Sequence, residues 1–82
     1  MLFKVVLDQE IHVTNFKSHQ NYQDLLKFIQ TVFKKLPSQY HLEYTDEDGD
    51  NIQLLGEEDL SNLLGMDMHK VFLEIKSDQK QT

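Results

Sequence analysis

The sequence predicts an α+β fold in which a mixed β-sheet packs against one main helix. Two observations lead to this prediction. Five short segments alternate apolar and polar residues, as half-buried strands do, and with two helical segments they give the order strand, strand, helix, strand, strand, helix, strand. Residues 22–36 instead repeat apolar residues at spacings of three and four, which is typical of an amphipathic helix. A length of 82 residues, of which 39% are hydrophobic, suits one domain with a single modest core.

Two strands joined by a turn are predicted at the start of the chain. Every second residue of segment 2–7 is apolar, and Lys4 falls on the face opposite the side chains of Phe3, Val5 and Leu7. Residues 11–14 alternate in the same way. Because the segment 8–10 between the two strands is short and polar, we expect a hairpin.

The longest amphipathic pattern predicts the main helix. Asn21 is suited to be its N-cap, and Pro37 is expected to end it. We expect the apolar stripe to face the core, and a helix that binds a partner is the alternative. The stripe consists of Tyr22, Leu25, Leu26, Ile29, Val32, Phe33 and Leu36.

A second hairpin and a short helix follow. Alternation over 40–44 and 52–54 predicts two strands, and Asp48-Gly49 between them is typical of a turn. The segment 57–64 begins with three acids, which the exposed N–H groups and the dipole of a helix favour in its first turn. Gly65 is expected to end this helix.

A last strand at residues 71–76 completes the predicted domain. The domain is expected to span residues 1–76, and the polar segment 77–82 to be a tail or the start of a linker. This order of elements predicts a ubiquitin-like β-grasp fold. Function must then be argued from the site, because one fold hosts many functions.

Acidic residues are concentrated in one part of the sequence. The chain has a net charge of -6, and half of its 14 carboxylates lie in one window without lysine, whereas the other half is slightly outnumbered by eight lysines. A structural explanation exists, since acids solvate turns and stabilise helix N-termini. Seven crowded like charges nevertheless repel one another, so we expect them to form a surface for a basic partner protein. They are Asp46, Glu47, Asp48, Asp50, Glu57, Glu58 and Asp59.

Composition argues against several other classes of function. A pI near 5.0 and the absence of arginine disfavour nucleic acid, whose phosphates are bound mainly by Lys and Arg. No apolar run approaches the roughly 20 residues of a membrane helix. Cysteine is absent and the four histidines have no metal-ligand or catalytic spacing, so we expect neither an enzyme nor a cofactor. A cytoplasmic location is expected.

The acidic window also carries a family resemblance. Its residues are Tyr44-Thr45-Asp46-Glu47-Asp48-Gly49-Asp50, then apolar Ile52 and Leu54, then Glu57-Glu58-Asp59-Leu60. This motif resembles the OPCA acidic motif of the Phox-and-Bem-one (PB-one) interaction domains. The resemblance implies a β-grasp module that docks front to back, the acidic face of one domain on the basic face of another. Members bearing both faces can associate with themselves head to tail.

The resemblance assigns roles to individual residues. Asp46, Asp48 and Asp50 correspond to the acidic loop, and Glu58 and Asp59 to the acids of the second helix. On the basic face, a first-strand lysine corresponds to Lys4. The second strand departs from the family pattern, because in place of Arg or Lys it offers only a histidine and, at its end, a lysine: His12 and Lys17. Because a docking domain alone would connect nothing, we expect the N-terminal module of a longer scaffold, kinase or adaptor in signalling. The resemblance implies that its partner is another such domain or a second copy.

Calcium binding is the alternative function for the acidic loop. Asp46, Asp48, Asp50 and Glu57 occupy positions 1, 3, 5 and 12 of an EF-hand loop. Position 6, where an EF-hand needs glycine, is Asn51, and a strand is predicted where an EF-hand has a helix. The sequence therefore favours protein binding over a metal site.

Overall fold

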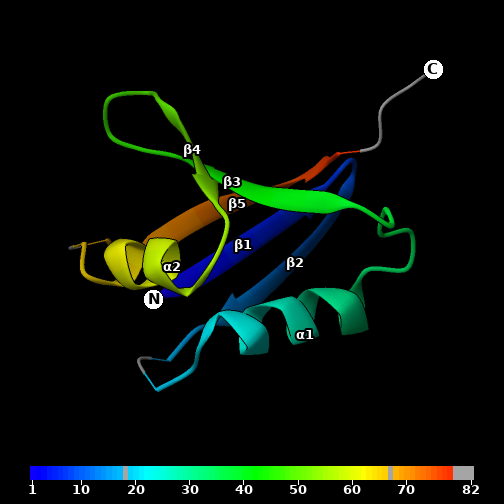
Figure 1. Ribbon diagram of the computed structural model, residues 1–82, viewed down its shortest axis with the longest axis horizontal. Coiled ribbons are helices and arrows are strands. Elements are labelled where there is room, and N and C mark those ends of the chain that lie inside the picture. The colour runs from blue at the N-terminus through cyan, green and yellow to red at the C-terminus, as the bar shows by residue number, and fades with distance from the viewer. Residues whose placement is uncertain (18, 67, 79–82) are drawn as a thin grey trace.

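The computed structural model describes residues 1–17, 19–66 and 68–78, and its elements follow the predicted order (Figure 1). The elements are β1 (Leu2–Leu7), β2 (Glu10–Asn15), α1 (Tyr22–Val32), β3 (Tyr40–Thr45), β4 (Asn51–Leu54), α2 (Glu57–Leu64) and β5 (Lys70–Ser77).

The strands form one mixed sheet in the order β2-β1-β5-β3-β4. β5 lies in the middle, parallel to β1 and antiparallel to β3. The hairpins β1–β2 and β3–β4 are antiparallel, and their second strands are the two edges. This is an α+β arrangement with the ubiquitin-like fold, as the sequence predicted.

The core lies between one face of the sheet and the two helices. Burial alternates along β1 and β5, so each strand turns every second side chain toward the helices. α1 contributes Leu25 and Ile29, and α2 contributes Leu60 and Leu63. No described helix covers the opposite face of the sheet, which we call the open face (Figure 1).

Helix α1 ends earlier than the sequence predicted. It was expected to continue until Pro37, but it ends at Val32, and Phe33 is extended, with φ −89° and ψ 125°. Three successive β-branched or aromatic residues, 31–33, weaken the helix, and a residue that precedes proline disfavours the α conformation. The extended backbone lets the Phe33 ring pack edge-on against His12, with ring centroids 4.7 Å apart.

Strand β2 turns its apolar residues away from the core. Ile11 and Val13 are 50% and 53% exposed on the open face, whereas His12 lies on the helix side. The strand was predicted correctly, but its alternation alone did not reveal which face would be buried. This inverted orientation matters for the open face described below.

Strand β5 ends at Ser77, one residue beyond the end that the sequence predicted. The N–H of Asp78 donates to the carbonyl oxygen of Gln39 at 2.9 Å. Residues 79–82 of the expected tail lie outside the described residues.

Candidate functional site

The loop between β3 and β4 is organised by its first acid. Oδ1 of Asp46 accepts hydrogen bonds from the N–H groups of Asp48 and Asp50, at 3.0 and 2.8 Å. The N–H of Asp46 donates to the carbonyl oxygen of Asp50 at 2.9 Å. Gly49 has φ +84°, a conformation that glycine adopts without strain. The loop is therefore built to hold its acids in fixed positions.

Three loop carboxylates are brought close together. Oxygens of Asp46, Asp48 and Asp50 all lie within 4.8 Å of one another. Asp48 and Asp50 are exposed, as is the neighbouring Glu47. None of the ion pairs found among the described residues involves them. Their mutual repulsion is thus uncompensated within the described chain.

The second acidic group lies in the first turn of α2. Oδ2 of Asp59 accepts from the N–H of Leu55 at 2.9 Å, and Glu57 accepts from the N–H of Tyr22 at the start of α1. These two acids therefore stabilise the N-terminal ends of α1 and α2. Glu58 is exposed and makes none of the hydrogen bonds found in the described chain.

Tyr44 on β3 connects the two acidic groups. Burial raises the pKa of its phenol above the usual value, and the negative charges of Asp46 and Asp59 raise this pKa further. One acid from the loop and one from α2 therefore act on the same buried side chain. The sequence predicted that the two acidic groups form one surface, which we call the acidic face, and this shared influence on Tyr44 supports the prediction.

Lys4 lies in the other half of the sheet, on the open face. It pairs with Val13 on β2 and with Phe72 on β5. Its Nζ lies 5.4 Å from the centroid of the Phe72 ring, and Nζ of Lys70 lies at the same distance from this ring. Two ammonium groups therefore share one aromatic side chain through cation–π contacts.

The other residues expected on the basic face are placed differently. His12 pairs with buried Val5 and faces the helices, and its Nε2 lies 2.6 Å from Glu10. It does not share a face with Lys4. Lys17 is exposed just after Phe16, whose N–H donates to the carbonyl oxygen of Met1 at 2.8 Å. Lys17 therefore lies near the start of β1, and the cation–π contacts to Phe72 found among the described residues come from Lys4 and Lys70.

Sequence reasoning missed Lys70 and Phe72 as partners of Lys4. Phe72 lies among the polar positions of β5, and such a misplaced aromatic residue was the available indication of a surface role. Nothing local showed that Lys4 and Phe72 would be paired, because β1 and β5 come from opposite ends of the chain.

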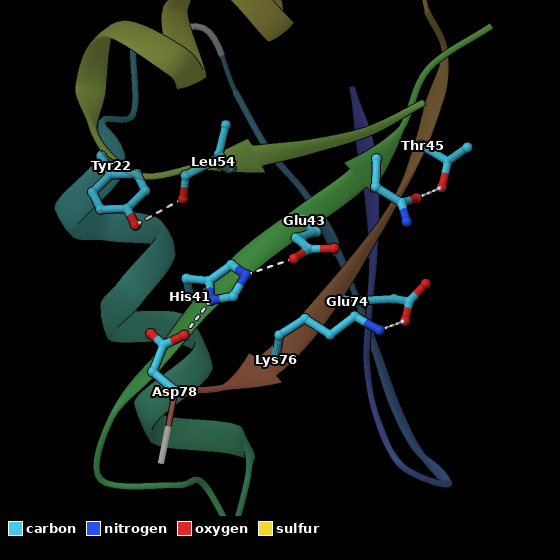
Figure 2. Close-up of polar contacts among 9 residues, drawn as sticks. Tyr22, His41, Glu43, Thr45, Leu54, Glu74, Lys76 and Asp78 are labelled. Carbon is cyan, nitrogen blue, oxygen red and sulfur yellow. Dashed lines mark hydrogen bonds and ion pairs between the residues drawn. The ribbon is translucent and has the colours of Figure 1, made fainter. Parts of the chain in front are cut away.

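Charges on the remaining part of the open face are paired internally (Figure 2). His41 contacts Glu43 through Nε2 at 2.6 Å and Asp78 through Nδ1 at 2.5 Å. Nζ of Lys76 contacts Glu74 at 3.0 Å. The acidic loop and Lys4 differ from these residues, because they take part in none of the ion pairs in the described ranges.

The acidic loop does not have the geometry of an EF-hand. It follows a strand, β3, and one oxygen of Asp46 is already occupied by two backbone N–H groups. The carboxylate cluster alone therefore does not identify a metal site.

Comparison with known families agrees with the geometry. The family model of the PB1 domain matches residues 1–78. This range includes the strands β1 to β5, the helices α1 and α2, and both charged surfaces. No curated protein shows significant similarity to the chain. In the described ranges, no helix is both long and apolar enough to span a membrane. Since the match covers nearly the whole chain, the protein belongs to the PB1, or Phox-and-Bem-one, family of protein–protein interaction domains.

Proposed function

We propose that this domain docks front to back onto another PB1 domain, its acidic face meeting the partner's basic face. One observation carries the proposal: three exposed or half-exposed carboxylates, whose oxygens lie within 4.8 Å of one another, take part in none of the ion pairs among the described residues. The family provides partners of the same fold, and this acidic cluster specifies a basic one.

The clustering explains how exposed charges can hold two proteins together. A single exposed ion pair contributes only about 0–1 kcal/mol. Several carboxylates around one ammonium group contribute more, because docking also relieves their mutual repulsion. Complementary patches of this kind set orientation and association rate, and their effect decreases with added salt.

The Lys4 side of the open face supports a second part of the proposal. Lys4 and Lys70 take part in no ion pair of the described chain, and Lys4 lies on β1, which β5 separates from β3 and its acidic loop. One copy can thus offer an acidic face and a basic face at once. We place the domain in a cytoplasmic signalling scaffold that forms heterodimers or head-to-tail chains.

Calorimetric titration with a PB1 domain that carries a strongly basic face tests the acidic face. Asp48→Asn should reduce binding below detection, because it removes a charge from the cluster. Asp8→Asn is a matched control with the same charge change in the β1–β2 turn, where asparagine tolerates the φ of +54°. Equal affinity of both variants would remove the acidic loop from the interface.

Sedimentation velocity at low and high salt tests head-to-tail association. Species heavier than the monomer should appear with increasing protein concentration and disappear with salt, and Lys4→Ala should leave only monomer. Persistence of the heavier species in Lys4→Ala would show that another surface causes association.

Calcium binding remains distinguishable by experiment. The cluster of three carboxylates favours it, whereas the strand before the loop and the engaged Asp46 oxygen count against it. We expect calcium to leave the melting temperature unchanged, and a rise that Asp48→Asn abolishes would contradict this.

A further inference from the structure

The exposed apolar side chains gather at the two charged surfaces. Five large hydrophobic residues of the described chain are markedly exposed. Ile11, Val13 and Phe72 lie on the same side of the sheet as Lys4. Leu55 and Met66 lie beside the acids, as shown below. On the basis of the proposed function, we infer that docking between two copies of this chain joins apolar side chains as well as charges: the apolar ring around Lys4 receives the methionine-flanked acidic end of the second copy.

Lys4 is surrounded by apolar side chains. Val13 and Phe72, each 53% exposed, pair with it from the two neighbouring strands. Adjacent strands lie about 4.8 Å apart, so these two side chains flank Lys4 across a width of about 10 Å. In the next row, Val6 pairs with Ile11, which is 50% exposed. Lys4 is therefore a cation within an apolar surface, which we call the Lys4 platform (Val6, Ile11, Val13 and Phe72 around Lys4).

An apolar surround strengthens an ion pair at its centre. Covering the platform removes water from the ammonium and from the carboxylate that meets it, and electrostatic attraction increases where water is excluded. Burial of the apolar rim also stabilises the complex, and an isolated exposed ion pair lacks this contribution. Interface residues that surround a central contact and exclude water act in this way.

The acidic face has a matching apolar border. Met66, 41% exposed, and Met68 line a hollow together with Asp46, Glu47 and Asp48. Leu55, 60% exposed, donates its N–H to Asp59. Methionine is flexible and adapts to irregular apolar surfaces. The acidic end thus presents carboxylates next to apolar atoms, which is the complement of the Lys4 platform.

A second copy of the chain is the occupant that fits both properties. Each copy carries the platform on β1, β2 and β5, and the acidic loop between β3 and β4 (Figure 1 shows these strands). The charges are opposite, and the apolar borders are of similar character.

Two single-faced variants isolate one interface for measurement. A Lys4→Ala chain retains only the acidic end, and an Asp48→Asn/Asp50→Asn chain retains only the platform. Their mixture should form a one-to-one complex by calorimetry, while neither variant associates alone. Phe72→Thr in the platform chain and Met66→Gln in the acidic chain then remove apolar surface without changing charge.

We expect each of these two substitutions to weaken the complex about tenfold, because each removes apolar surface that docking would bury. The slope of affinity against salt should stay unchanged, because no charge is lost. Phe72→Leu, which keeps apolar surface, should retain most of the affinity. Ile11→Thr on the edge strand provides a second test if Phe72→Thr fails to fold, and thermal melting checks the fold of every variant.

The result can separate this inference from the proposed function. If Phe72→Thr, Ile11→Thr and Met66→Gln keep affinity within about twofold while the unmodified chain still associates through its charges, the apolar contact is wrong and charge docking stands. If the unmodified chain stays monomeric at low salt, a second copy is the wrong occupant. Titration with a separate basic PB1 domain then decides the proposed function independently.

Discussion

At the scale of single residues, the seven carboxylates of the acidic face divide into two groups. Asp46, Glu57 and Asp59 accept hydrogen bonds from backbone N–H groups and thereby hold the loop and the helix ends. Glu47, Asp48, Asp50 and Glu58 are exposed, and their side chains make none of these bonds. The sequence predicted that the acids would gather, but not this division, because hydrogen-bond partners depend on how the backbone folds around each carboxylate.

This division predicts different effects of two alanine substitutions. Asp46→Ala leaves two N–H groups without their acceptor and should lower the free energy of unfolding by about 1–2 kcal/mol. Asp48→Ala, at an exposed position, should change it by less than about 0.5 kcal/mol. Urea denaturation of both variants measures the difference. Equal destabilisation would mean that Asp46 does not organise the loop.

His41 predicts how stability depends on pH. The hydrogen bond of His41 to Glu43 is the largest effect and raises its pKa, burial opposes this rise, and the hydrogen bond to Asp78 adds to it, so that the pKa is raised overall. Lys76 lies opposite His41 in the register of β3 and β5, so its positive charge faces the same side of the sheet. Because the pKa is raised in the folded state, the stabilisation is complete below the unfolded value of about 6.5 and is lost as pH rises through the folded pKa.

We therefore expect the free energy of unfolding to fall between about pH 6 and pH 9, and the fall to be smaller in His41→Gln. Denaturant titrations at both pH values measure this. His69→Gln, at an exposed histidine, is the matched control. An identical pH dependence in His41→Gln and the unmodified protein would show that His41 is not the responsible group.

At the scale of elements, the spacing of apolar residues correctly predicted those strands and helices that bury one face. β1, β5 and the order of all seven elements followed from alternation and helical spacing. The end of α1 did not, because Phe33 leaves the helix to meet His12 on a distant strand. The orientation of β2 did not either, since an edge strand with alternating residues fits either face until its partner is known.

A capping box stabilises the start of α1. Asn21 accepts from the N–H of Asp24 at 3.0 Å, and the Asp24 carboxylate accepts in return from the N–H of Asn21 at 2.9 Å. Asn21→Ala should lower the free energy of unfolding by about 1 kcal/mol, because such a cap satisfies an otherwise unpaired N–H group. Gln23→Ala, exposed in the same turn, is the control for urea denaturation. A cap variant as stable as this control would contradict the assignment.

At the scale of the whole molecule, the charge distribution predicts opposite responses of folding and of the proposed binding to salt. Repulsion within the acidic face disfavours the isolated folded domain, and salt weakens this repulsion. Attraction between the acidic face and a basic partner is weakened by the same salt. The net charge of -6 alone would not predict this contrast, which arises because half of the acids lie in one window.

The isolated domain should therefore melt at a higher temperature as sodium chloride rises from about 0.01 M to about 1 M, over which the screening length falls from about 30 Å to about 3 Å. The Lys4→Ala chain is the suitable host, because we expect this substitution to remove the proposed head-to-tail association. Adding Asp48→Asn and Asp50→Asn to this host should reduce the salt-dependent rise, since fewer like charges remain to be screened. The difference between these two chains cancels the general effect of salt on burial of apolar surface. An equal rise in both would mean that the carboxylate cluster does not store repulsion in the free domain, and that the affinity for a basic partner must come from direct contacts alone.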